Sequence, residues 1–264
     1  MSLREEFYKG DDEDGSGGNL KENVFLPRIG IVYLLKPDLS LYATYNKGFD
    51  PFEASGVAQV FDEPFKPVTS QLMEAGFKGN FFKNKLSASL ALYQLVLQNV
   101  AVNANDISNP DLFIQQGENR SRGIEAEASG NILPNLGVFL TYSYNQSKII
   151  KSKIASQVGM LAENAPRNTS GSYIKYTFAG GAIKGLGFSV GHSSVGARNT
   201  LDPKITLPGY LTINAGMHYS YEHFKIAVNL DNITNKVYWT GAYNSIYKWP
   251  GKPANFMISI GYEL

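Results

Sequence analysis

The connections between the strand-like segments of this chain alternate between short and long. Near the C-terminus, apolar residues alternate with smaller or polar ones over residues 211–219, 224–230 and 256–264. A tight turn at Tyr221-Glu222 joins the first two segments, and a long stretch from Asn232 to Pro253 precedes the third. Period-2 alternation is typical of a strand with one apolar and one polar face. Regular alternation of short and long connections predicts an up-and-down antiparallel sheet with all its short turns at one end.

The composition fits a transmembrane β-barrel and excludes several other classes. The net charge is +1, so no overall field favours nucleic acid as a partner. The chain has no cysteine, which excludes disulfides and cysteine-ligated metals. The mean hydropathy is -0.19, and no apolar run is long enough for a transmembrane helix. A β-barrel crosses a bilayer without such a run, because only every second residue faces lipid.

The same pattern, followed along the chain, predicts eleven strands. They fall within residues 29–35, 39–45, 73–77, 86–92, 113–132, 138–144, 167–178, 186–190, 211–219, 224–230 and 256–264. Short turns are expected at Lys36-Pro37-Asp38, Phe82-Lys83-Asn84, Leu133-Pro134-Asn135 and Gly180-Gly181. The apolar phase changes near Tyr93–Leu95, which predicts a β-bulge.

The strand count predicts an orientation and an incomplete barrel. If the short turns are periplasmic, an odd number of strands places the C-terminus in the periplasm. The acidic, Gly-rich segment Lys9–Glu22 is then an extracellular loop, and Leu3–Tyr8 is the end of a preceding strand. Bacterial single-chain barrels normally have an even strand number, so we expect part of a larger barrel. Met1–Glu6 has no signal-peptide character, so the chain either starts inside a longer protein or is not exported.

Six motifs follow one another along most of the chain. They are Pro27–Tyr33, Leu39–Phe49 with Pro51, Glu74–Lys78, Gln116–Glu125, Leu207–Tyr210 and Val228–Tyr238. In this order and at this spacing they resemble the barrel of TonB-dependent siderophore receptors of the Gram-negative outer membrane. The resemblance covers residues 23–264.

The resemblance implies a barrel of about 22 strands whose lumen holds an N-terminal plug. Residues 1–264 would be the C-terminal part of that barrel, with the plug absent. The implied function is uptake of ferric siderophores, energised by TonB through the missing N-terminal parts, without enzymatic activity. Outer-membrane lipid would surround the barrel, and strand Phe256–Leu264 resembles the signal for the barrel-assembly machinery. Leu264 departs from the aromatic residue with which the family usually ends.

The last long loop supplies the main candidates for contact with a ligand, expected to be an iron(III)–siderophore complex. Its aromatic residues are Tyr238, Trp239, Tyr243, Tyr247 and Trp249. Rigid aromatic side chains give contact area at low entropic cost. Tyr238 and Trp239 also suit an aromatic belt at the membrane interface. Further candidates near the outer strand ends are Phe113, Gln115, Gln116 and Arg198. Of these, the basic Arg198 could attract an anionic chelate.

Other interpretations remain open at this point. A small complete outer-membrane barrel of about ten to twelve strands, acting as a pore or an enzyme, has a suitable size. A soluble all-β binding domain is a second alternative. Glu125 and Glu127 suit an acid/base pair but equally suit charges in a wet lumen. His218 and His223 lie across a hairpin without a third ligand, and no hydrolase or nucleotide motif is present, so no catalytic residue, metal site or covalently bound cofactor is expected.

Overall fold

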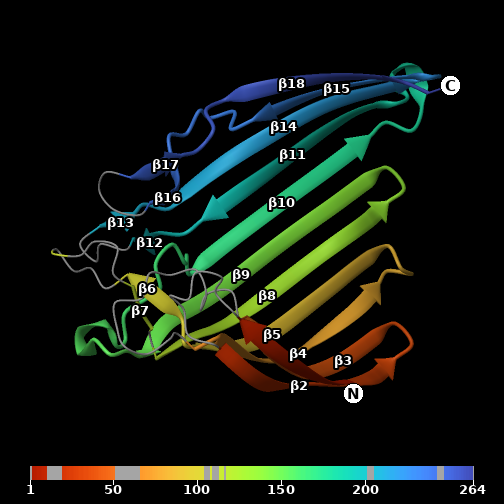
Figure 1. Cartoon of the computed structure of the whole chain (residues 1–264). Coiled ribbons are helices and arrows are strands. Elements are labelled where there is room, and N and C mark those ends of the chain that lie inside the picture. Colours follow the sequence, from red (N-terminus) through yellow and green to blue (C-terminus); the bar gives the residue numbers. More distant parts are fainter. Residues whose placement is uncertain are drawn as a thin grey trace.

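The computed structural model describes residues 2–10, 20–50, 66–103, 108, 113–115, 117–200, 205–242 and 247–263. Within these residues the fold is an antiparallel sheet of twelve strands whose spatial order follows the sequence (Figure 1). The strands are β1 (Ser2–Gly10), β2 (Leu20–Lys36), β3 (Leu39–Asp50), β4 (Val68–Phe81), β5 (Leu86–Gln98), β8 (Glu118–Leu133), β9 (Leu136–Lys151), β10 (Asn168–Thr177), β11 (Leu186–Val195), β14 (Tyr210–Tyr221), β15 (Phe224–Asp231) and β18 (Asn255–Tyr262). Ten of the eleven predicted strands are confirmed, the predicted strand 113–132 is divided, and the segment expected to precede them forms β1.

The two ends of the sheet differ as the connection lengths predict. The short turns lie together at one end, which we call the short-turn end, and the longer connections lie at the other, the long-loop end (Figure 1). Pro37-Asp38 and Pro134-Asn135 form two of the short turns. The turn after β4 uses left-handed backbone at Phe82, Lys83 and Asn84. The end of β18 lies at the short-turn end, in agreement with the strand count.

One face of the sheet carries the predicted apolar residues in every strand. Rows of paired residues on neighbouring strands define this apolar face, for example Ile31, Ala43, Ala75, Leu92, Ile124 and Tyr144. A second row near the C-terminus contains Phe188, Met217, Val228 and Ile258. Because the side-chain period is two, this register keeps every predicted apolar set on the same side.

The opposite face is polar. Thr44, Glu74, Tyr93, Gly123 and Asn145 form one of its rows. Glu125 and Glu127 lie on this face as expected, opposite Ser143 and Thr141 of β9. A hollow of about 480 Å³ opens on this face near the short-turn end. Its polar lining includes Ser40, Lys78, Ser89 and Glu127.

No second layer from the described part of the chain covers the apolar face. Ile31 is 68% exposed, Leu92 54% and Ile260 75%. In the described residues, the buried hydrophobic side chains are Val68, Leu207 and Ala242, all at the long-loop end. The described helices are two short 3₁₀ turns, η1 (Ala155–Gln157) and η2 (Gly181–Ile183). No helix in this part of the chain is long and apolar enough to cross a membrane. A soluble sandwich would cover its apolar face, so the soluble alternative loses support.

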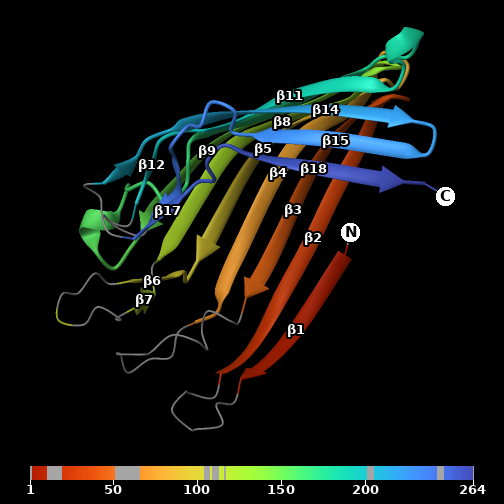
Figure 2. The same cartoon turned by 90° about the horizontal axis from the view of Figure 1, so that it is seen from above.

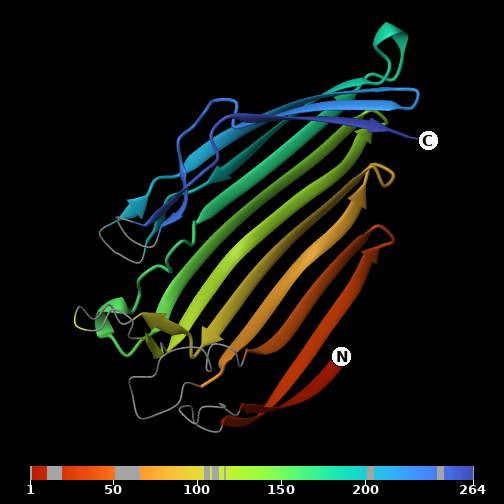
Figure 3. The same ribbon diagram turned by 45° about the horizontal axis from the view of Figure 1, so that its top comes forward.

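The sheet curves across its width but remains open. Figure 2 shows the curvature from above, and Figure 3 shows β1 and β18 as the two edges of the sheet. Among the described strands, β1 pairs only with β2, and β18 pairs only with β15. The twelve strands therefore do not close into a small complete barrel, and both edges keep unpaired backbone groups.

Three local predictions are wrong. The pairing of β5 with both neighbours runs without a shift through Tyr93–Leu95, so no bulge is present there. Both faces are half-buried in this part of β5, and apolar residues therefore occur on both. Residues 113–132 are not one strand: β7 (Phe113–Gln115) pairs with β6 (Ala101–Asn103), and β8 begins after Gly117. Lys9–Glu22 is not all loop, because β1 ends at Gly10 and β2 begins at Leu20.

Candidate functional site

Three segments meet at the long-loop end of β11 and β14. One is the connection between β9 and β10, which pairs with β9 at Lys148 and Leu161. The second is the hairpin of β12 (Arg198–Asn199) and β13 (Thr206–Leu207). The third is the hairpin of β16 (Trp239–Ala242) and β17 (Lys248–Pro250), drawn beside the second in Figure 1. The third hairpin carries three of the predicted contact residues, Trp239, Tyr247 and Trp249, and Tyr238 directly precedes it.

Asn164 joins the first segment to the third. Its Nδ2 donates to the carbonyl of Ala242 at 2.9 Å, and its Oδ1 accepts from the Ala242 amide at 3.2 Å. The Asn164 amide also donates to the carbonyl of Asn199 at 2.8 Å. The left-handed backbone of Asn164, with φ 49°, suits asparagine better than most residues. One side chain therefore fixes the position of β16.

Arg198 lies inside this cluster, with 4% of its surface exposed. Its Nη2 donates to the carbonyl of Trp239 at 2.6 Å, and its guanidinium lies 5.8 Å from the centre of the Tyr210 ring. The sequence predicted a surface cation that attracts an anionic ligand. The structure instead places Arg198 where it supports the Trp239 backbone and the Tyr210 ring.

Tyr210 and Tyr238 pack against each other beside Arg198. Their ring centres are 4.3 Å apart, with 34° between the ring planes. Gly251 makes room for this pair, because a Cβ there would lie 2.1 Å from Cζ of Tyr238. Its amide also donates to the carbonyl of Tyr238 at 2.8 Å. Tyr238 is thus fixed from both sides.

The β16–β17 hairpin presents further aromatic rings with a cation. Lys248 Nζ lies 5.7 Å from the centre of the Trp239 ring. Tyr247 is 65% exposed and Trp249 is 54% exposed. We call Tyr210, Tyr238, Trp239, Tyr247, Lys248 and Trp249 the loop aromatic cluster. This cluster combines exposed rings with positive charge, a surface suited to a planar or anionic ligand.

Asn232 holds the base of the same loop and was not predicted. It is 3% exposed, and its side chain donates to the carbonyls of Lys236 and Lys252 at 2.9 and 3.0 Å. Its Oδ1 accepts from the Lys236 amide at 2.9 Å. The signal in the sequence was an asparagine directly after the apolar run of β15, where left-handed backbone is common.

Glu163 adds a titratable group next to Asn164. Desolvation by the surrounding loop raises the pKa of its carboxyl above the ordinary value. More than a third of the residue is still exposed, so solvent screens much of this effect. The carboxyl is nevertheless easier to protonate than a free glutamate.

The remaining candidates lie elsewhere or cannot be placed. The Gln115 side chain accepts from the Lys66 amide and donates to the carbonyl of Asn99, both at 2.9 Å, so it connects two loops. Phe113 belongs to β7 of the separate β6–β7 hairpin. Gln116 and Tyr243 lie outside the described residues. Among the described residues, no group of three or more His, Asp or Glu side chains is arranged to hold a metal ion.

The histidines bond within the sheet. His218 Nε2 lies 3.0 Å from Thr177 Oγ1 on the polar face. His192 lies on the apolar face between Ser170 and Ser172, at 3.0 and 2.6 Å from their hydroxyl oxygens. His223 packs against Tyr262, with ring centres 5.7 Å apart.

Comparison with known proteins identifies the family. A family profile described as "TonB dependent receptor-like, beta-barrel" matches residues 1–233. The chain belongs to this family of TonB-dependent receptor barrels. Receptors of the family are outer-membrane β-barrels that act in transport. The fold prediction and the resemblance from the motifs are both confirmed.

Individual relatives of this TonB-dependent receptor barrel are distant. It is 28% identical over 237 residues to the metal-pseudopaline receptor of Pseudomonas aeruginosa, covering 89% of this chain and 33% of that one. It is 24% identical over 270 residues to the ferric-pyoverdine M114 receptor of Pseudomonas sp., covering 97% and 31%. The crystal structure of the ferripyoverdine receptor of the P. aeruginosa outer membrane superposes with a TM-score of 0.81 at 23% identity, covering 98% and 35%. The chain spans about a third of the length of the relatives it matches.

Proposed function

We propose that this chain is the C-terminal part of the barrel of an outer-membrane receptor for ferric siderophores. The apolar face contacts lipid, the polar face lines the lumen, and the missing strands pair with the free edges of β1 and β18. The long-loop end is extracellular and the C-terminus is periplasmic. An N-terminal plug and its contact with TonB would belong to the parts absent from this chain.

The observation that carries the proposal is the loop aromatic cluster at the long-loop end. Rings held by Asn164, Arg198 and Gly251 offer a preformed surface, which lowers the entropic cost of binding. The ammonium groups of Lys248 and Lys236 favour a negatively charged chelate. Metal-pseudopaline, ferric-pyoverdine and ferrioxamine B receptors are among the relatives, so chelated metal is the expected class of ligand.

In this proposal the receptor transports its ligand after binding it, and the residues of this chain catalyse no reaction. A ferric chelate would bind at the loop aromatic cluster and then enter the lumen, whose polar face carries Glu74, Glu125 and Lys78. Energy from TonB would act on the plug. The barrel-assembly machinery would recognise the segment 256–264, which contains most of β18, during insertion.

A fluorescence titration tests the proposal. In the receptor of which this chain forms part, bound ferric siderophore should quench Trp249, and Trp249→Phe should remove most of that quenching. Tyr247→Ala should weaken binding by roughly tenfold, because stacking of one ring contributes about 1 kcal/mol or more. The chain on its own should bind more weakly than the receptor. Saturable binding at equal strength by the isolated chain, or no response to any ferric siderophore, would contradict the proposal.

A further inference from the structure

The apolar face changes character toward the long-loop end of β4, β5, β8 and β9. Its last apolar row contains Ala75, Leu92, Ile124 and Tyr144. The next row contains Met73, Gln94, Arg122 and Gln146. The row after that contains Gln71, Val96, Arg120 and Lys148. Charged and amide groups therefore follow directly above a surface of exposed apolar residues.

Arg120 and Lys148 are direct cross-strand partners in this region. Like charges directly opposite each other in an antiparallel pair destabilise it. No carboxylate in the described part of the chain forms an ion pair with either residue. Arg122, in the neighbouring row, donates from Nε to Gln94 Oε1 at 2.7 Å, and this neutral partner supplies no negative charge. Arg122 forms no ion pair with a carboxylate among the described residues.

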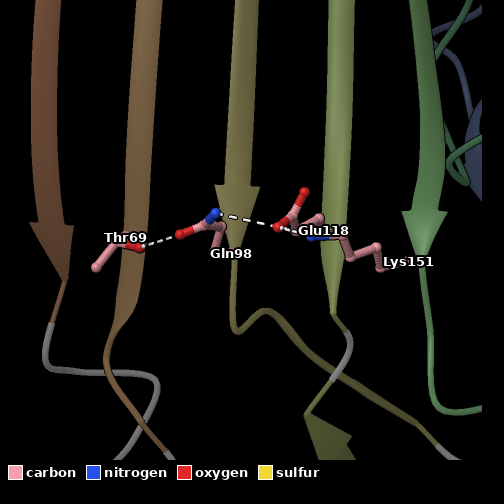
Figure 4. Close-up of polar contacts among 4 residues, drawn as sticks. All are labelled: Thr69, Gln98, Glu118 and Lys151. Atoms are coloured by element: carbon pink, nitrogen blue, oxygen red, sulfur yellow. Dashed lines mark hydrogen bonds and ion pairs between the residues drawn. The ribbon is translucent and has the colours of Figure 1, made fainter.

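Glu118, a carboxylate two residues before Arg120, is already engaged. Glu118 Oε1 accepts from Lys151 Nζ at 2.6 Å and from Gln98 Nε2 at 3.1 Å. Thr69 extends this chain of bonds by donating to Gln98 Oε1 at 3.3 Å (Figure 4). This series of hydrogen bonds runs across four strands, and the Glu118 carboxylate is neutralised within it by Lys151. Arg120, Arg122 and Lys148, which we call the cation group, gain no counter-charge from it.

We propose that the cation group binds the phosphate of a lipid headgroup in the membrane leaflet at the long-loop end. A phosphate between Arg120 and Lys148 removes their repulsion, and guanidinium groups bind phosphate oxygens by paired hydrogen bonds. This inference rests on the proposed function only in requiring that the apolar face contact lipid.

The surface below the cation group supports a lipid rather than a soluble anion. Leu92 is 54% exposed and Ile124 is 38% exposed, directly beneath Arg122 and Gln94. Acyl chains attached to a bound phosphate would lie on these side chains. Tyr142, 45% exposed on the same face, has the character of an interfacial aromatic residue.

Native mass spectrometry of the receptor in detergent tests the proposal. The probe is dioleoyl phosphatidic acid, compared with dioleoylglycerol, which has the same acyl chains without phosphate. We expect R120Q/K148Q to retain phosphatidic acid roughly tenfold more weakly than the unchanged receptor, through loss of charge-assisted hydrogen bonds. The exchange variant R120K/K148R should retain it. The matched control K78Q/K175Q removes two cations from the polar face and should retain phosphatidic acid as strongly as the unchanged receptor does.

The outcomes separate the possible ligands and the two proposals. Equal retention by R120Q/K148Q and the unchanged receptor would overturn the inference, and so would equal retention of dioleoylglycerol. Displacement of phosphatidic acid by inorganic phosphate alone would assign the site to a free anion and overturn the lipid assignment. Siderophore binding is measured separately, so a receptor that binds a ferric siderophore without selective lipid retention contradicts only this inference.

Discussion

The side-chain amide of Asn164 bonds both backbone groups of Ala242, which lies 78 residues further along the chain. Ala242 is fully buried, so its backbone groups need hydrogen-bond partners within the protein. This relationship connects the β9–β10 connection to the hairpin that carries Trp239 and Trp249. The loop aromatic cluster therefore depends on a residue remote from it in sequence.

Substitution of Asn164 should loosen the β16–β17 hairpin. Asn164→Gly keeps the left-handed backbone accessible but removes both bonds, at an expected cost of about 1–2 kcal/mol in local stability. Hydrogen exchange at the Ala242 amide should accelerate accordingly. Asn164→Asp keeps the acceptor for that amide and should give an intermediate rate. Unchanged protection of Ala242 in Asn164→Gly would show that the bonds do not hold the hairpin.

Gly251→Ala should separate Tyr238 from Tyr210. The added Cβ lies within 2.1 Å of the Tyr238 ring, so the ring must move, at a cost of about 1–3 kcal/mol. Trypsin should then cleave faster after Lys248. Gly180→Ala is the matched control, because a Cβ at Gly180 has no neighbour within 4 Å. Equal cleavage of both variants would argue against the packing role of Gly251.

Ile258→Arg tests the assignment of the apolar face. Ile258 pairs with Val228 on that face, whereas the next residue, Ser259, lies on the polar face opposite Ala227. Arginine at mid-depth in lipid should destabilise the inserted barrel by roughly 2–4 kcal/mol, and Ser259→Arg should cost much less. Urea unfolding of the receptor in lipid vesicles measures both. A smaller loss for Ile258→Arg than for Ser259→Arg would reverse the two faces.

Glu163 should make the β9–β10 connection sensitive to pH. A raised carboxyl pKa means that the folded loop favours the protonated form. Its stabilising contribution is complete below the ordinary glutamate pKa and is lost as the pH rises through the raised value. Glu163→Gln should therefore reduce hydrogen exchange of residues 152–167 at neutral pH and leave it unchanged in acid. The effect should be small, because Glu163 is partly exposed. Opposite pH dependence would refute this assignment.

The sheet could be predicted because each strand and each turn is marked by residues close together in the sequence. Strict alternation in β14, β15 and β18 defines both the strand and its apolar face, and Pro or Asn in the turns defines the connections. The same logic failed at Tyr93, where the sequence loses its alternation although the strand continues. It also could not detect β6 and β7, which have only three residues each.

The site could be predicted only in part. Both tryptophans and Tyr238 could be named as candidates because aromatic residues concentrated in one long loop are a local signal, and their contact with a ligand stays a prediction. Asn164 and Asn232 were missed, since their partners lie in segments that only the folded chain brings together. Arg198 was expected to contact the ligand, and the structure places it beneath Tyr210 and Trp239. A sequence shows a positive charge but not whether folding buries it.

The most direct test of the account is accumulation of radioactive iron by cells that carry the complete receptor. We expect uptake from a ferric siderophore when TonB is present, loss of uptake when TonB is deleted, and reduced uptake when Tyr247 and Trp249 are both replaced by alanine. Uptake that is independent of TonB, or full uptake by the double variant, would contradict the account.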